Sequence, residues 1–153
     1  MTIGITAVAA AAVVVGIVTG SLVSLVSGIA VARLARLDPV ITMSLAPKSV
    51  TAAIAVEIAS LLGGDEALTA AFVIATGALG SMLGPWFLSR IRIANPVARG
   101  LAVGTTAHGQ GTAMMLHEGE TQGALSGVAM ALAAIFTSFV VPILVPWVVH
   151  VWG

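Results

Sequence analysis

Residues 3–32 read IGITAVAAAAVVVGIVTGSLVSLVSGIAVA and contain no charged side chain. A helix of about 20 apolar residues crosses a hydrocarbon core about 30 Å thick, so this run predicts a membrane-spanning helix with length to spare. Small residues recur at every fourth position, at Gly16, Gly20, Ser24 and Gly28. Such a stripe lies along one helix face and predicts that another helix approaches it closely.

The composition of the whole chain agrees with this interpretation. Of its 153 residues, 59% are hydrophobic and 8% are charged, against about 25% charged residues in an ordinary soluble domain. The few basic residues exclude nucleic acid as a partner, because such binding needs a basic face. The absence of cysteine excludes disulfides and Cys-based metal sites. We therefore expect an integral protein of a lipid bilayer, with no metal or other cofactor.

Four further apolar segments follow, and polar turns separate them: residues 40–62, 67–88, 100–116 and 123–149. Pro47 and Lys48 interrupt the first of these, and a glycine-rich stretch around His108 interrupts the third. Proline and glycine in apolar segments mark broken helices. We predict an all-α fold, a polytopic transmembrane helix bundle of about five crossings with two interrupted helices, within a single domain spanning residues 1–153.

Charged residues at the turns give an orientation if all five segments cross the membrane. Five basic residues then share one side, namely Arg33, Arg36, Arg90, Arg92 and Arg99, while four acidic residues fall on the other, namely Asp65, Glu66, Glu118 and Glu120. Because basic residues are enriched in cytoplasmic loops, we predict the N-terminus outside and the C-terminus in the cytoplasm. A re-entrant segment 40–62 would instead place Arg90, Arg92 and Arg99 outside, so the charge pattern favours a crossing.

The sequence also contains an internal similarity at a shift of about 57 residues, which aligns Arg33-Leu34 with Arg90-Ile91 and Asp38-Pro39-Val40 with Asn95-Pro96-Val97. The predicted repeat units are residues 3–62 and 67–116, followed by a final helix over residues 123–149. Chance similarity is the alternative, because few positions are identical. Interrupted segments at corresponding positions of two repeats indicate a transporter binding site near the bilayer midplane.

Lys48 is the most informative single residue. At roughly 1.5 Å per residue it lies about 15 Å from Pro39, near the centre of the membrane. A helix that restarts after Pro47 would point the amides of Lys48, Ser49 and Val50 at the same place as the ammonium group, which suits a carboxylate. We predict an anion site at Lys48, Ser49, Val50 and Thr51. The alternatives are that Lys48 pairs with an internal carboxylate or extends to the interface.

The fourth segment offers a second half of this site. Its polar and glycine positions lie near the membrane centre and supply neutral hydrogen-bonding groups, at Thr105, Thr106, His108, Gln110, Gly111 and Thr112. Close helix packing at the glycines around a hydrogen-bonded histidine is the alternative. Glu57 and His108 are candidates for proton coupling, although Glu57 also suits a structural place near the interface. So few polar groups form no recognisable catalytic set, so we expect no enzyme activity and no catalytic residue.

Several motifs resemble the LrgB/CidB family of bacterial antiholin-like membrane proteins, which is related to the plastid glycolate/glycerate translocators. Ser44-Leu45-Ala46-Pro47-Lys48-Ser49-Val50-Thr51 is similar to the family's lysine motif, and Ala98-Arg99-Gly100-Leu101-Ala102-Val103-Gly104-Thr105 to a second one. His108, Gly111-Thr112-Ala113 and Gly77-Ala78-Leu79-Gly80 add to the resemblance. The family's N-terminal region has no counterpart in this sequence, and Thr51-Ala52-Ala53 replaces a Thr-Thr-Pro that follows the lysine motif.

The resemblance implies two competing functions in the bacterial plasma membrane. One is a transporter or facilitator subunit for small monocarboxylates such as pyruvate or glycolate, working with a small LrgA/CidA-like membrane partner or as a homo-oligomer. The other is a holin/antiholin-like regulator of murein hydrolase export and autolysis that transports nothing itself. The arrangement around Lys48 favours the first, because a regulator of this kind has no evident need for an anion site.

Overall fold

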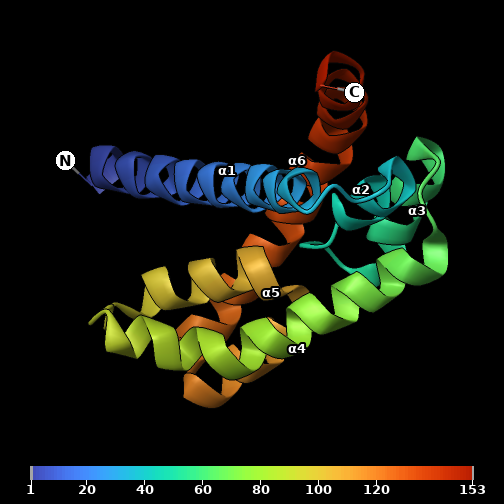
Figure 1. The fold of residues 1–153 in the computed structure, drawn as a ribbon. Helices are drawn as coiled ribbons and strands as arrows, with labels where there is room; N and C mark the ends of the chain where they lie inside the picture. The colour runs from blue at the N-terminus through green and yellow to red at the C-terminus, as the bar shows by residue number, and fades with distance from the viewer. Residues whose placement is uncertain (1, 153) are drawn as a thin grey trace.

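The structure is a computed structural model that describes the backbone of residues 2–152 and the side chains of residues 9–147. It contains six helices, shown in Figure 1: α1 (Thr2–Leu34), α2 (Pro39–Leu45), α3 (Ala52–Leu62), α4 (Glu66–Arg90), α5 (Pro96–Glu118) and α6 (Glu120–Trp152). No strand occurs between residues 2 and 152. The all-α class and both helix interruptions are therefore confirmed.

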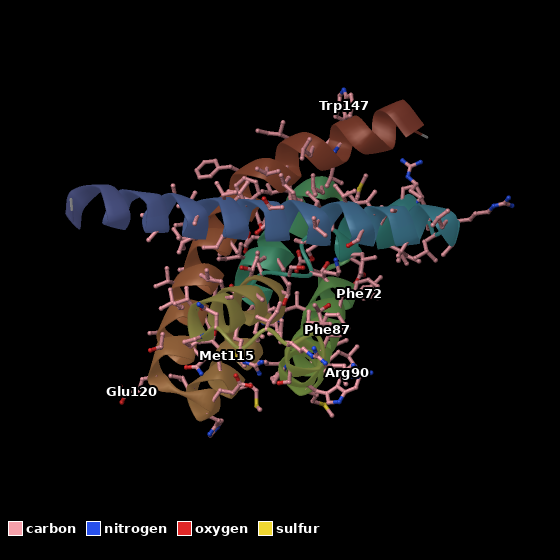
Figure 2. The ribbon with its side chains drawn as sticks, turned by 90° about the vertical axis from the view of Figure 1, so that its left-hand side faces the viewer. Phe72, Phe87, Arg90, Met115, Glu120 and Trp147 are labelled. Carbon is pink, nitrogen blue, oxygen red and sulfur yellow. The ribbon has the colours of Figure 1, made fainter. Side chains whose placement is uncertain are left out.

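Three of these helices are long and apolar enough to cross a membrane, over Ala9–Leu34 of α1, Glu66–Arg90 of α4 and Glu120–Trp147 of α6. Buried Ile17 of α1 packs against Ala129 and Ala133 of α6, and small residues on α6 let the two helices approach. Figure 2 shows Met115 in the interior of the bundle, with Glu120 and Trp147 at its periphery. The apolar side chains exposed on α1, α4 and α6 are suited to contact with lipid.

The second apolar segment forms a short helical hairpin, which we call hairpin 1 (residues 39–62). Asp38 caps its start, since the Asp38 carboxylate accepts a hydrogen bond from the Val40 amide at 2.8 Å, and Pro39 suits the first helical turn. The chain turns at residues 46–51 and returns as α3. The Asp65 amide beyond α3 donates to Ser44 Oγ of α2 at 2.8 Å. This bond ties the end of α3 to the last turn of α2, so α3 packs back along α2.

The fourth segment, α5, is likewise a hairpin rather than one straight helix, which we call hairpin 2 (residues 96–118). The backbone at His108 is not helical, with φ 39° and ψ −131°. The second half packs back on the first: a Cβ at Gly111 would lie 2.6 Å from Ala107 Cβ, and Met115 joins the apolar cluster of Val103 and Ala107. Arg99 and Glu118, near the two ends of α5, form an ion pair.

The two hairpins change the predicted topology. Within the described residues, three helices are long and apolar enough to cross a membrane, where the sequence predicts about five crossings, because segments 40–62 and 100–116 form hairpins instead of long straight helices. Arg90, Arg92 and Arg99 therefore share an end with Glu118 and Glu120, instead of facing them across the membrane. Arg33 and Arg36 lie at the other end. The hairpin at residues 39–62 agrees with the re-entrant alternative for segment 40–62, while the side of the membrane on which each end of the bundle lies stays a prediction.

Candidate anion site at the tips of two hairpins

The tip of hairpin 1 rests on α1 through Lys48. The Lys48 ammonium group donates to the Ser24 carbonyl oxygen at 2.8 Å and to Ser24 Oγ at 3.4 Å. Ser24 Oγ also shares a hydrogen bond with Ser49 Oγ. Gly28 leaves the space that the lysine needs, because a Cβ there would lie 2.7 Å from Lys48 Nζ. The small-residue stripe of α1 thus receives a hairpin tip rather than a long helix.

This contact lies deep within the span. Ser24 precedes the end of α1 at Leu34 by ten residues, which corresponds to about 15 Å along a helix. Lys48 is half-buried there. An ammonium group at this depth is unfavourable by at least about 2.5 kcal/mol unless another group compensates it.

Within residues 9–147, no ion pair joins Lys48 to a carboxylate. The alternative that Lys48 pairs with an internal carboxylate therefore finds no support in the described part of the chain. Because Lys48 Nζ points at Ser24 in mid-span, the alternative that it extends to the interface finds none either.

The backbone of the tip differs from the prediction. The Lys48 amide donates to the Leu45 carbonyl at 3.1 Å and the Val50 amide to the Pro47 carbonyl at 3.2 Å. These two amides close tight turns instead of pointing at the ammonium group, because α3 begins at Ala52 and not directly after Pro47. Thr51 is the N-cap of α3 and makes no capping bond with its side chain.

Val50 is part of the apolar core of the bundle. It is 2% exposed and packs in an apolar cluster with Ala55 of α3, Val73 of α4 and Ala134 of α6. This cluster fixes the tip of hairpin 1 against α4 and α6.

The tip of hairpin 2 rests on α4 through His108. His108 is 5% exposed, and its Nε2 lies 3.0 Å from the Val73 carbonyl oxygen. Since a carbonyl only accepts, Nε2 carries the proton of this bond. Gly77 makes room for the tip, because a Cβ there would lie 2.5 Å from both His108 Cε1 and Gln110 Oε1.

The three threonines of hairpin 2 each donate to a carbonyl of the preceding turn, and Thr112 also bonds to α6. Thr105 is buried with its methyl group against Gly20 of α1, and its hydroxyl donates to the Leu101 carbonyl. Thr106 is exposed and donates to the Ala102 carbonyl. The Thr112 hydroxyl donates to the His108 carbonyl at 2.9 Å, and it also shares a hydrogen bond with Ser126 Oγ of α6 at 3.0 Å. Thr112 and Gly111 therefore hold the hairpin together and join it to α6.

The two tips meet the same two long helices. On α1, Gly20 faces Thr105 while Ser24, one turn later, binds Lys48. On α4, Val73 packs against Val50 and accepts the bond from His108. Within the described side chains no hydrogen bond joins residues 48–51 to residues 105–112 directly. The structure places the two half-sites side by side without closing them on each other.

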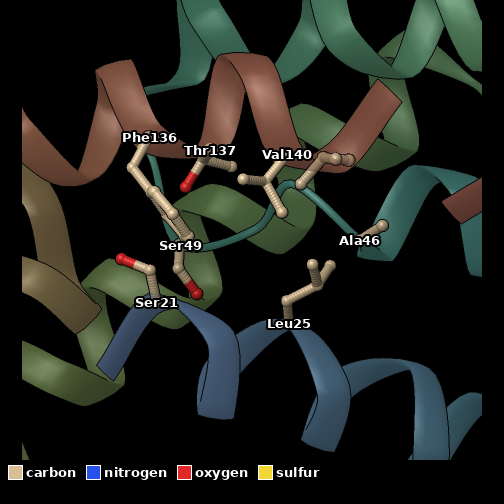
Figure 3. Close-up of a pocket in the computed structure, with 8 residues that line it drawn as sticks. Ser21, Leu25, Ala46, Ser49, Phe136, Thr137 and Val140 are labelled. Carbon is tan, nitrogen blue, oxygen red and sulfur yellow. The ribbon is translucent and has the colours of Figure 1, made fainter. Parts of the chain in front are cut away.

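Three hydroxyl residues that the prediction left out of the site also lie here. Ser24 binds Lys48, while Ser21 and Thr137 line a cavity of about 10 Å³ together with Ser49, Leu25, Ala46, Phe136, Val140 and Val141. Figure 3 shows Ser21 of α1, Ser49 of hairpin 1 and Thr137 of α6 around this cavity. The spacing of Ser21 and Ser24, which puts both on one face of an apolar helix, was the available signal in the sequence.

The other candidate groups lie apart from this site. Glu57 is exposed on α3. Among the described residues, no group of three or more His, Asp or Glu side chains is placed to hold a metal ion.

The chain is similar to a known protein family and to several individual proteins. The model of the LrgB-like family matches residues 4–147. YwbG of Bacillus subtilis is 38% identical over 132 residues, which cover 86% of this chain and 59% of YwbG. The Antiholin-like protein LrgB of Bacillus mycoides is 35% identical over 132 residues, covering 86% of this chain and 57% of that protein. The chain thus spans somewhat more than half the length of these relatives. No solved structure matches it.

Proposed function

The chain belongs to the LrgB-like family of membrane proteins, and from this premise we propose that it carries small monocarboxylates such as pyruvate or glycolate across the bacterial plasma membrane. The carboxylate would bind at Lys48. A small LrgA/CidA-like membrane protein or further copies of this chain are proposed as its partners.

One observation carries this proposal: the Lys48 ammonium group lies in mid-span with two oxygens of Ser24 as its partners, and it forms no ion pair with a carboxylate among residues 9–147. An uncompensated cation inside a membrane protein marks a path or site for a charged ligand. A monocarboxylate supplies the single negative charge that Lys48 lacks. The hydroxyl of Ser49 lies at the same tip, where a carboxylate oxygen can accept its hydrogen bond.

The two hairpins supply a way to open this site. Hairpin 1 enters from the end of the bundle where α1 finishes, and hairpin 2 from the end where α4 finishes. Each tip is held on a long helix by a few polar contacts, Lys48 with Ser24 and His108 with Val73. Release of one tip at a time would expose the site to one side of the membrane and then to the other, which is the alternating access of transporters.

The same geometry supports the proposed repeat. Units 3–62 and 67–116 each contain a long apolar helix followed by a helical hairpin whose tip lies beside a long helix. In this arrangement Ser49 and Thr51 of the first unit would face Thr105, Thr106, His108 and Gln110 of the second when the half-sites close. Glu57 and His108 stay candidates for coupling transport to protons.

Uptake into proteoliposomes tests the proposal. Protein with the native sequence should accumulate labelled pyruvate or glycolate, and Lys48→Met should abolish that uptake because it removes the charge while keeping an unbranched side chain. Arg92→Met is the matched control, since Arg92 is an exposed cation at the end of the bundle. Equal uptake by the native protein and Lys48→Met would refute the assignment of the site.

The second candidate function rests on the printed names of relatives, several of which are Antiholin-like protein LrgB. As a regulator of murein hydrolase export the chain would act without carrying an acid. Cells that produce Lys48→Met should then keep the autolysis behaviour of cells with the native protein. Loss of transport together with changed autolysis would instead connect the two functions.

A further inference from the structure

The Ser21 hydroxyl is a buried polar group without a partner. Ser21 is 7% exposed, and its Oγ makes no hydrogen bond with any group that the structure describes. Most serines in apolar helices donate to a carbonyl of the preceding turn, as Ser44 and Ser138 do here. A buried hydroxyl left unpaired is unfavourable by about 1–3 kcal/mol, so this one needs an explanation.

The cavity that Ser21 faces has the size and the lining of an oxygen site. Its volume of about 10 Å³ admits about one oxygen atom. Three hydroxyl-bearing residues are among those that line it, Ser21 of α1, Ser49 of hairpin 1 and Thr137 of α6 (Figure 3). A hydroxyl can both donate and accept, so these groups suit a neutral oxygen, either a hydroxyl or a carbonyl.

A chain of hydrogen bonds joins the lining of this cavity to the ammonium group of Lys48. Ser49 lines the cavity and shares a hydrogen bond with Ser24 Oγ, which in turn accepts from Lys48 Nζ. Ser21 and Ser24 are three residues apart, on one face of α1. A charged group and a neutral oxygen site thus lie next to each other along the same helix face.

We propose that Ser21 and Thr137 form a subsite for the second oxygen of the carried acid, the 2-hydroxy or 2-oxo oxygen, while Lys48 holds its carboxylate. This inference rests on the proposed function, and it adds the feature by which the site selects among monocarboxylates. Apart from Ser49, the remaining lining residues, among them Leu25 and Phe136, are apolar and offer nothing to a second charge. An acid without the 2-oxygen leaves the Ser21 hydroxyl unpaired, and the site discriminates against it for that reason.

Competition with labelled pyruvate in proteoliposomes tests the subsite. Unlabelled glycolate and acetate differ by the 2-hydroxyl group alone, so the ratio of their inhibition constants measures its recognition. The native protein should prefer glycolate by about fivefold, the value of one hydrogen bond between neutral groups. Ser21→Ala and Thr137→Val should each lower that preference toward one while leaving inhibition by acetate unchanged.

Ser138→Ala is the matched control, because the Ser138 hydroxyl on the same helix as Thr137 donates to the Ala134 carbonyl at 2.8 Å. It should keep the native preference. A native protein without any preference for glycolate, or an unchanged preference in both Ser21→Ala and Thr137→Val, overturns the subsite while leaving transport at Lys48 standing. A native protein that takes up none of these acids overturns the proposed function and the subsite together.

Discussion

Arg99 and Glu118 stand nineteen residues apart near the two ends of α5, yet their side chains form a bidentate ion pair, with Arg99 Nε 2.8 Å from Glu118 Oε2 and Nη2 2.5 Å from Oε1. A straight helix would separate them by about 28 Å. The pair therefore shows that the fourth apolar segment enters and leaves at one end of the bundle. Arg99 also donates to the carbonyl oxygens of Pro85 and Ile93, which fixes hairpin 2 to the end of α4.

The hairpin topology predicts which introduced cysteines react with a labelling reagent from the same side of the membrane. The chain contains no cysteine, so single cysteines report cleanly. Ala94→Cys and Glu120→Cys should react with a membrane-impermeant maleimide from one side, and Leu37→Cys and Ala67→Cys from the other. The measurement compares intact spheroplasts with inverted vesicles. Labelling of Ala94→Cys and Glu120→Cys from opposite sides would restore a crossing at residues 100–116 and contradict the structure.

Loss of one partner of the Arg99–Glu118 pair should be strongly destabilising. Glu118→Gln leaves the mostly buried guanidinium without its counter-charge, and we expect a decrease of about 3 kcal/mol in the free energy of unfolding. Denaturant unfolding in detergent micelles measures it. The double variant Arg99→Met/Glu118→Met should be less destabilised than the sum of its single variants, because neither charge is left alone. Strict additivity would mean that the pair contributes nothing specific.

Gly28→Ala should displace the Lys48 ammonium group without unfolding the protein. The new methyl group would lie 2.7 Å from Lys48 Nζ, and the end of a lysine side chain can move away. We expect a loss of at least tenfold in monocarboxylate uptake with stability close to native. Gly16→Ala is the control, because nothing lies within 4 Å of its Cβ position, and it should keep uptake. Native uptake by Gly28→Ala would show that the position of Lys48 at Ser24 does not matter.

His108→Gly should be more stable than His108→Ala. Both variants lose the bond to Val73 equally, so the difference reports the backbone alone. At φ 39° a residue with a Cβ is strained by about 1–3 kcal/mol, whereas glycine is not. Thermal unfolding of the two variants in the same detergent measures this difference. Equal stability would mean that the turn at residue 108 relaxes when the histidine is removed.

The sequence predicts the apolar segments and the interruptions well, for physical reasons that are local. Uncharged runs, Asx-Pro starts at Asp38 and Asn95, and the breaks near Pro47 and His108 all depend on residues close together in the chain. The side chains of Asp38 and Asn95 do cap α2 and α5. No local rule says whether a broken apolar segment continues across the membrane or returns.

Whether a broken apolar segment folds back on itself depends on contacts between distant residues, such as Arg99 with Glu118 and Ser44 with Asp65. The prediction of about five crossings assumed that every apolar segment crosses the membrane. The sequence singles out Lys48 and His108 by residue type and depth, and the structure places each at a hairpin tip; their role in binding stays a prediction. The spacing of Ser21 and Ser24 indicates a polar face on α1, but only the packing of α1 and α6 on hairpin 1 brings Ser21, Ser24 and Thr137 close to Ser49.

Both hairpin tips are anchored on main-chain oxygens, of Ser24 by Lys48 and of Val73 by His108. A side chain can be replaced during evolution, but every residue carries a carbonyl group. These two bonds thus constrain the backbone of α1 and α4 rather than the type of residue, whereas the Ser24 hydroxyl, which also bonds Lys48 and Ser49, and the buried Val73 side chain are constrained by contacts of their own. Selection would act on the reach of the lysine and the histidine, and on Gly28 and Gly77 opposite them.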